Sequence, residues 1–124
     1  MSTCSTETEN VVRQHLHAFL QGHGADAIIS DYHESARLIT EDQVFAGRPA
    51  IRHFFEQFLG ALPPGATDRF KLKNLRVDGT MALITWNVGN DIPLGTDTFV
   101  VVDGKIASQT FAMHAAPAPA APSG

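Results

Sequence analysis

Residues 96–111 read TDTFVVVDGKIASQTF, with an Asp-Gly pair between two runs rich in β-branched and aromatic residues. Asp-Gly favours a tight turn between antiparallel strands, so this stretch predicts a β-hairpin. Alternate residues of a strand point to opposite faces, which places Val100 and Val102 on one face and Phe99 and Val101 on the other. Because both faces are apolar, we expect both to be covered in the folded protein.

The predicted hairpin consists of strands at residues 94–104 and 105–114, and two further strand-forming runs precede it at residues 67–79 and 80–90. A second Asp-Gly pair lies where these two earlier runs meet, as a turn between strands requires. In the first run the alternation of charged and apolar residues changes parity near Asn74, which predicts a β-bulge there. The second half of the chain is therefore expected to form an antiparallel sheet.

The first half of the chain has mainly helical periodicity. We expect helices at residues 6–22, 25–32 and 47–62, with a short pair of strands at residues 35–40 and 44–47 before the third helix. Three helices followed by a sheet predict an α+β domain with the helices packed on one face of the sheet.

Composition limits the possible partners. The 124 residues include 9 Lys and Arg against 13 Asp and Glu, which gives a net charge of −4, and 44% are hydrophobic. We expect one domain at residues 6–114, a flexible N-terminus at residues 1–5 and a disordered Ala/Pro tail at residues 115–124. The chain has no basic patch for nucleic acid or an anionic membrane, no membrane span and no signal peptide, so we expect neither partner and a cytoplasmic location.

Metal and cofactor sites have no support in the sequence. No two of the six histidines stand four residues apart on a predicted helix, and the single cysteine, Cys4, cannot form an internal disulfide. The chain also lacks a glycine-rich phosphate loop and a nucleophile elbow. We therefore expect no bound metal and no cofactor.

Two stretches resemble a known group of proteins. The segment GRPAIRHFF at residues 47–55 and the hairpin at residues 96–111 are similar to the third helix and last hairpin of the nuclear transport factor two-like superfamily. This superfamily includes ketosteroid isomerases and SnoaL-like polyketide cyclases, and the resemblance covers nearly all of residues 6–114. It implies a cone, in which a curved mixed sheet carries three N-terminal helices on its concave face and encloses a pocket. The resemblance specifies the fold rather than the reaction, because one scaffold hosts many functions.

His15 is the first candidate for a polar residue in that pocket. Helical periodicity places it with the apolar residues of the first helix, on the side that faces the core. A histidine there can donate a hydrogen bond or carry a proton, because its side chain titrates near neutral pH. The alternative is a core histidine whose ring is satisfied by a backbone carbonyl or a water.

Asp97 is the second candidate and the stronger one. It lies on the strand whose two faces are both expected to be covered, and desolvation raises the pKa of a carboxyl group in such surroundings. The resemblance implies a role, because in ketosteroid isomerases an Asp at the matching strand position stays protonated and donates a hydrogen bond to the developing oxyanion. The alternative is a structural Asp bound to backbone amides or to Thr85 or Thr98.

The sequence also departs from the isomerase pattern. His15 stands where ketosteroid isomerases carry an oxyanion-hole tyrosine, and Thr40 stands where they carry a general-base aspartate. Threonine cannot serve as a base near neutral pH, so we do not expect steroid isomerisation by that route. A SnoaL-like cyclase, which closes a polyketide ring with acid and base residues, could instead use Asp97 and His15.

Limonene epoxide hydrolase, another member of the superfamily, activates water with an Asp-Arg-Asp group. Arg37 and Arg76 are the arginines considered for such a group, and neither has a carboxylate partner at a suitable spacing. We therefore place this activity below the isomerase and cyclase hypotheses.

Aromatic and apolar residues are expected to form the wall of the pocket. Each of them alone also suits an ordinary core, but together they indicate a flat, apolar ligand. The predicted substrate-contacting residues are Phe19, Tyr32, Thr40, Phe54, Phe58, Trp86, Val88, Phe99, Gln109, Phe111 and Met113.

Two hypotheses about function remain. The first is a cofactor-independent isomerase, cyclase or dehydratase in which Asp97 and His15 act as acid, base or oxyanion-stabilising groups. The second is a module of the same fold that binds an apolar small molecule or mainly supplies an interaction surface. Both predict a homodimer, because the sheet face that the helices leave open must be buried by something.

Overall fold

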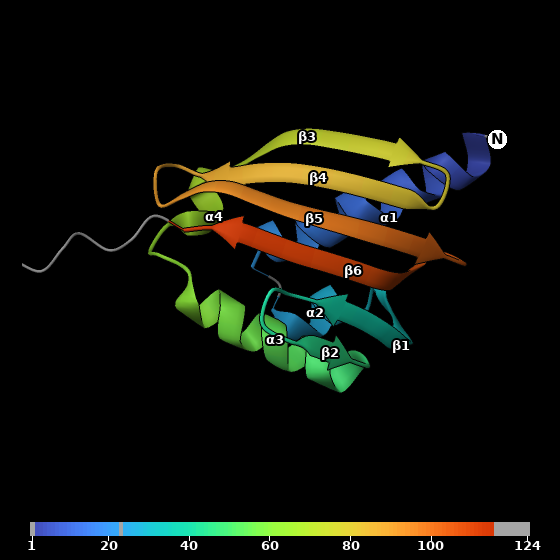
Figure 1. Cartoon of the computed structure of the whole chain (residues 1–124), viewed down its shortest axis with the longest axis horizontal. Coiled ribbons are helices and arrows are strands. Elements are labelled where there is room, and N and C mark those ends of the chain that lie inside the picture. The colour runs from blue at the N-terminus through green and yellow to red at the C-terminus, as the bar shows by residue number, and fades with distance from the viewer. Residues whose placement is uncertain (1, 23, 116–124) are drawn as a thin grey trace, which may run out of the picture.

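A curved sheet of six strands forms the frame of the protein in the computed structural model, which describes residues 2–22 and 24–115 (Figure 1). The strand order is β2-β1-β6-β5-β4-β3. Neighbouring strands are antiparallel except β1 and β6, which are parallel, so the sheet is mixed. The strands are β1 (Tyr32–Ile39), β2 (Val44–Ala46), β3 (Phe70–Asp78), β4 (Met81–Val88), β5 (Ile92–Val102) and β6 (Lys105–His114).

The longer helices cover one face of this sheet. In Figure 1, α1 (Ser2–Leu20) runs behind the strands β3 to β5, and α3 (Arg48–Ala61) lies beside β1 and β2. The short helices are α2 (Ala25–Ile29), which packs on α1 and α3, and α4 (Ala66–Arg69), which precedes β3. This arrangement confirms the predicted α+β class and the cone of the resembled superfamily.

Alternation along the central strands decides which side chains form the core. On β4 every second residue from Ala82 to Val88 is buried, and on β5 the buried set includes Asp97, Phe99 and Val101. These residues share the concave face with the buried side of the helices. The prediction that both faces of β5 are covered is wrong within the chain, because Val102, on the convex face, is 41% exposed.

The N-terminal helix begins at Ser2, earlier than the predicted start at residue 6. Contacts with the turn between β3 and β4 account for the longer helix. The hydroxyl of Thr8 donates to the carbonyl oxygens of Cys4 and Gly79, and the Gly79 amide donates to the Ser5 hydroxyl. The predicted tail, from residue 116 onward, lies outside the described residues.

The second helix ends at Ile29, and Tyr32 is the first residue of β1 rather than the last residue of a helix. The cause is long-range pairing, since Tyr32 pairs with Ile106 of β6 and the Ile106 amide donates to the Asp31 carbonyl. The predicted bulge is confirmed, because the register between β3 and β4 shifts between Leu72 and Asn74.

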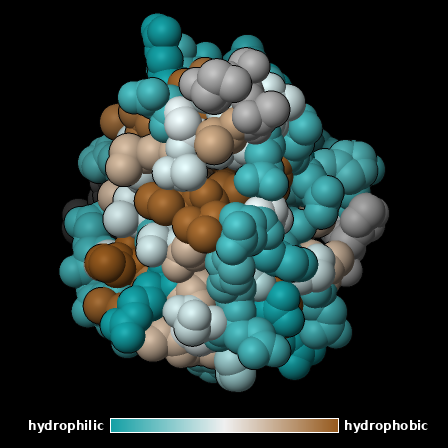
Figure 2. Space-filling model, turned by 90° about the vertical axis from the view of Figure 1, so that its right-hand side faces the viewer, coloured by the Kyte–Doolittle hydropathy of each residue, from teal (hydrophilic) through white to brown (hydrophobic). Residues whose placement is uncertain are grey.

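Apolar side chains also reach the surface. Figure 2 views the end of the molecule where α1 begins and the β3–β4 and β5–β6 turns lie, and it shows an apolar patch among mostly hydrophilic residues. The exposed large apolar residues of the described chain are Ile39, Val44, Met81, Leu83, Leu94 and Val102. In the described part of the chain, no helix is long and apolar enough to cross a membrane.

Candidate active site

A small cavity of about 40 Å³ lies between the concave face of the sheet and the helices α1 and α3. Such a volume holds about three water molecules. Its lining is apolar apart from three polar side chains, those of His15, Asp97 and Gln109. The lining residues are His15, Leu16, Phe19, Phe54, Phe55, Phe58, Phe70, Ile84, Trp86, Asp97, Phe99, Gln109 and Phe111.

Asp97 is held by two side chains from the strands on either side of β5. The indole nitrogen of Trp86, on β4, donates to Asp97 Oδ1 over 2.8 Å. The amide nitrogen of Gln109, on β6, donates to Asp97 Oδ2 over 2.7 Å. Strand alternation explains the arrangement, because all three residues point to the concave face. The alternative partners considered from the sequence, Thr85 and Thr98, do not bind this carboxyl group.

Burial sets the protonation behaviour of Asp97. The residue is 8% exposed, and desolvation raises the pKa of its carboxyl group from 3.8 to about 6. The hydrogen bonds from Trp86 and Gln109 act in the opposite direction and lower that pKa, because they stabilise the charged form. At neutral pH the carboxyl group is therefore ionised, with a pKa close enough to the working range for proton transfer.

His15 lies in the same cavity as Asp97. Its ring is 4% exposed and makes edge contacts with Tyr32, Phe55 and Phe99 at centroid distances of 5.5, 5.7 and 5.4 Å. Desolvation lowers the pKa of His15 from 6.5 to about 4, so the imidazole is neutral at physiological pH. Its buried Nδ1 has no hydrogen-bond partner among the described residues.

Tyr32 supports the site from behind. Its side chain is fully buried, and its hydroxyl donates a hydrogen bond to the amide oxygen of Gln109. Tyr32, Gln109, Asp97 and Trp86 therefore form one continuous chain of hydrogen bonds across four strands, β1, β6, β5 and β4.

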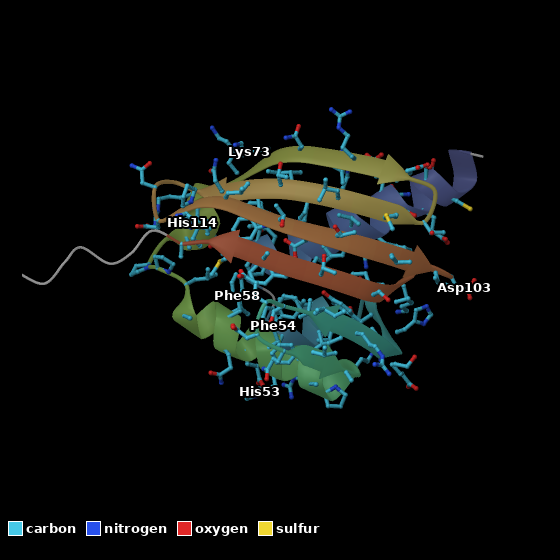
Figure 3. The ribbon with its side chains drawn as sticks, in the orientation of Figure 1. His53, Phe54, Phe58, Lys73, Asp103 and His114 are labelled. Atoms are coloured by element: carbon cyan, nitrogen blue, oxygen red, sulfur yellow. The ribbon has the colours of Figure 1, made fainter. Side chains whose placement is uncertain are left out.

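Aromatic rings form most of the wall. The rings of Phe54 and Phe58 are nearly parallel at 5.7 Å, and both contact Phe111 on β6. Figure 3 shows that Phe54 and Phe58 project from α3 toward the sheet, whereas His53 on the same helix points away from it. On the other side, the indole of Trp86 stacks between Phe70 and Phe111. This wall presents flat ring faces and edges to whatever enters the cavity.

Four predicted substrate-contacting residues are not among those that line this cavity. Tyr32 lies behind Gln109, and Val88 lines a smaller neighbouring hollow between α3, α4 and the sheet. Met113 packs against the core beside Gly95. Thr40 lies in the turn after β1, where its hydroxyl accepts hydrogen bonds from the amides of residues 42 and 43.

The other predicted residues line the cavity together: His15, Phe19, Phe54, Phe58, Trp86, Asp97, Phe99, Gln109 and Phe111. Sequence reasoning missed Leu16, Phe55, Phe70 and Ile84 as lining residues. Phe55 belongs to the apolar stripe of α3, a pattern that identifies the buried face of a helix without separating cavity wall from core. Phe70 begins β3 directly after α4, a helix that the sequence did not predict.

The described residues contain no group of three or more His, Cys, Asp or Glu side chains that could hold a metal ion. No arginine is among the lining residues of the cavity, so the described part of the chain does not assemble an Asp-Arg-Asp group there.

Comparison with known proteins agrees with this architecture. The SnoaL-like domain family matches residues 12–109, from α1 to the middle of β6. The chain belongs to this SnoaL-like family. No curated protein sequence matches it.

Several solved structures have the same fold as this chain. An NTF2-like protein of unknown function from Mesorhizobium loti is 25% identical, with a TM-score of 0.71, and the match covers 89% of this chain and 93% of that one. A candidate ketosteroid isomerase from Kribbella flavida is 21% identical, with a TM-score of 0.69 and coverage of 97% and 85%. A candidate polyketide cyclase from Sinorhizobium meliloti is 21% identical, with a TM-score of 0.68 and coverage of 82% and 93%.

Proposed function

We propose that this SnoaL-like protein catalyses cofactor-independent proton transfer on an apolar carbonyl compound, as an isomerase, cyclase or dehydratase does. The observation that carries the proposal is the placement of one ionisable carboxyl group, Asp97, and one neutral imidazole, His15, in a single aromatic cavity. Pairs of titratable groups whose surroundings push their pKa values apart are typical of acid–base sites. The names of the neighbours from Kribbella flavida and Sinorhizobium meliloti fit this class of reaction.

The hydrogen bonds around Asp97 favour the role of base. Both of its oxygens accept hydrogen bonds, one from the Trp86 indole and one from the Gln109 amide nitrogen. An indole N–H can only donate, so these partners match a carboxylate better than a protonated carboxyl group. This differs from the protonated, donating role that the resemblance to ketosteroid isomerases implied for Asp97.

In the proposed reaction, Asp97 takes a proton from the carbon next to the substrate carbonyl. Negative charge then develops on the carbonyl oxygen, where a hydrogen-bond donor in a dry site is most effective. The neutral imidazole of His15 supplies such a donor when its unpartnered Nδ1 carries the proton. Asp97 returns its proton to another carbon in an isomerisation. In a ring closure the enolate carbon instead attacks a second carbonyl, and the alkoxide that forms takes the proton back from Asp97.

A substrate larger than a few water molecules requires the cavity to widen. Phe54 and Phe58 are only half-buried, so rotating either ring toward solvent costs less free energy of apolar burial than rotating a fully buried ring would. The neighbouring hollow that contains Val88 shares Phe19, Phe58, Phe70 and Trp86 with the cavity. Movement of these shared rings would join the two spaces into a longer apolar slot, which suits a flat ligand.

Deuterium exchange tests the proposal without knowledge of the natural product. We would incubate the protein with 2-tetralone, a flat bicyclic ketone, in heavy water and follow loss of the α-proton signal by NMR. The proposal expects exchange above the buffer rate, rising with pH through about 6 as Asp97 ionises, and an Asp97→Asn variant that binds the ketone without accelerating exchange. Binding without exchange in the native protein would instead support the ligand-binding module.

The proposal includes a homodimer formed through the convex face of the sheet. Met81 on β4 pairs with Val100 on β5, and Leu83 lies two residues further along the same face. Met81 and Leu83 are 53% and 41% exposed in the single chain, an unusual surface for two neighbouring large apolar side chains. A second copy of this face would cover them.

A further inference from the structure

We infer that Gln109 and Tyr32 are positioning residues that hold the Asp97 carboxylate. Tyr32 does not line the cavity, and Gln109, which does, has its amide oxygen bound to Tyr32 and its amide nitrogen bound to Asp97. This inference rests on the proposed role of Asp97 as a base. Gln109 is 3% exposed and Tyr32 is fully buried. The two side chains form a buried hydrogen-bonded arm that links β1 through β6 to Asp97 on β5.

The arm depends on the orientation of one amide group. A glutamine amide has an oxygen that accepts and a nitrogen that donates, and only the nitrogen can face a carboxylate favourably. In the structure the Gln109 nitrogen donates to Asp97 Oδ2 over 2.7 Å, while the Gln109 oxygen receives the Tyr32 hydroxyl. The Tyr32 hydroxyl thus stabilises the amide orientation in which the Gln109 nitrogen faces Asp97.

The reversed orientation would favour a different chemical state. If the amide turned over, its oxygen would face Asp97, and the contact would be favourable only with a protonated carboxyl group that donates a hydrogen bond. A phenol donates more readily than it accepts, so Tyr32 opposes this reversal. Tyr32 therefore acts on Asp97 through Gln109, and it keeps the carboxyl group in the form that a base requires.

Few other titratable groups face Asp97. Among the described residues that line the cavity, α1 contributes His15, which is neutral above about pH 4, and α3 contributes only phenylalanines. From β1, Tyr32 has its own pKa raised well above its ordinary value by burial, with smaller contributions from the charges of Asp97 and of Asp31, the residue before it. A titration observed near pH 6 at this place can thus be assigned to Asp97.

The protein contains a reporter for that titration. Trp86 is the only tryptophan in the chain, and its indole nitrogen donates directly to Asp97. Its fluorescence should therefore change as Asp97 ionises, with a midpoint near pH 6, and an Asp97→Asn variant should lose the change. This readout requires neither a substrate nor turnover.

The decisive variants are Gln109→Met, Tyr32→Phe and the double variant. Gln109→Met keeps the length of the side chain but removes the donor to the carboxylate, so the midpoint should rise by about one pH unit. Tyr32→Phe removes only the hydroxyl, and the midpoint should rise by a smaller amount. Since Tyr32 acts through Gln109, the double variant should have the same midpoint as Gln109→Met alone.

Thr8→Val serves as the matched control, because it removes a buried hydroxyl whose partners, Cys4 and Gly79, lie toward the other end of β4. Its midpoint should equal that of the native protein. An unchanged midpoint in Gln109→Met would overturn the inference even if Tyr32→Phe failed to fold. Additive shifts in the double variant would overturn the link between Tyr32 and Gln109. The midpoints test only the positioning of Asp97. The proposed function is tested independently by whether the native protein accelerates deuterium exchange into 2-tetralone.

Discussion

Gly95 lies directly against the indole of Trp86, its partner across β4 and β5. A Cβ atom placed on Gly95 would stand 2.2 Å from Cε2 of that ring, far inside any normal contact. Gly95 does not have the positive φ that favours glycine in turns, so space rather than backbone conformation requires glycine here. The indole of Trp86 can therefore lie flat against Gly95, and its nitrogen is directed to Asp97, two residues after Gly95 on β5.

The first prediction concerns Gly95→Ala. The added methyl group must displace the Trp86 ring, which should lower the free energy of unfolding by about 2 kcal/mol, as overpacking of a core does. The displaced indole should also lose its hydrogen bond to Asp97. Urea unfolding measures the first effect, and a reduced pH dependence of Trp86 fluorescence near pH 6 measures the second.

Gly60→Ala is the control for this prediction. Gly60 lies in the last turn of α3, and a Cβ there has nothing within 4 Å. The variant should retain the native fluorescence titration and should be as stable as the native protein or up to about 1 kcal/mol more stable. If Gly95→Ala behaved like Gly60→Ala, the tight contact with Trp86 would be refuted.

Strand periodicity predicts which side chains share a face but not which of them meet. It places Trp86 with Ile84 and Val88, and Gln109 with Phe111, and the structure has these sets on the concave face. The hydrogen-bond partners of Asp97 were not predicted, because they depend on the register between three strands. The turns and bulges of the sheet set that register, including the shift between Trp86 and Val88.

Tyr32 illustrates a second limit of the sequence. Its spacing from Ile28 fits one face of a helix, and the same residue fits equally well at the start of a strand. The parallel pairing with Ile106 decides between the two, and it joins segments more than seventy residues apart. Local patterns carry no information about such a pairing, so the role of Tyr32 behind Gln109 could not be derived from them.

The second prediction uses the opposite pKa shifts of Asp97 and His15. The folded protein raises the pKa of Asp97 from 3.8 to about 6, so between these pH values the folded state binds more protons than the unfolded state. Asp97 therefore lowers the free energy of unfolding as the pH rises through this range. His15, whose pKa falls from 6.5 to about 4, lowers the free energy of unfolding as the pH drops through nearly the same range.

The two contributions nearly cancel in the native protein, and single variants should reveal them. Between pH 4.5 and 6, Asp97→Asn should make the slope of unfolding free energy against pH more positive by about 1 kcal/mol per pH unit. His15→Leu should make the slope more negative by a similar amount. Urea unfolding at several pH values measures both slopes, and native-like slopes in the two variants would contradict the assigned shifts.

The third prediction tests the dimer. Leu83→Glu places a charge on the convex face of β4 without touching the concave core, so the proposed dimer should dissociate while the fold remains intact. Light scattering during size-exclusion chromatography measures the mass, and circular dichroism checks the fold. Gln57→Glu, the same change in charge on the exposed side of α3, should leave the mass unchanged. A monomeric native protein would refute the dimer.

The fourth prediction concerns access to the cavity. Phe58 is one of four residues that line both the 40 Å³ cavity and the neighbouring hollow, so Phe58→Ala should open one continuous slot. A ligand would no longer need to move this ring, and the dissociation constant for 2-tetralone, measured by Trp86 fluorescence, should fall by about tenfold. The same variant should lose about 1–3 kcal/mol of unfolding free energy, because a half-buried ring is removed.

Phe45→Ala is the matched control for Phe58→Ala. Phe45 on β2 is also half-buried and packs against Phe54 at 5.1 Å, but it lines neither the cavity nor the hollow. It should lose stability without gaining affinity for 2-tetralone. Equal affinities in both variants would mean that Phe58 does not limit binding, whereas tighter binding only in Phe58→Ala would identify this ring as the barrier between the cavity and the neighbouring hollow.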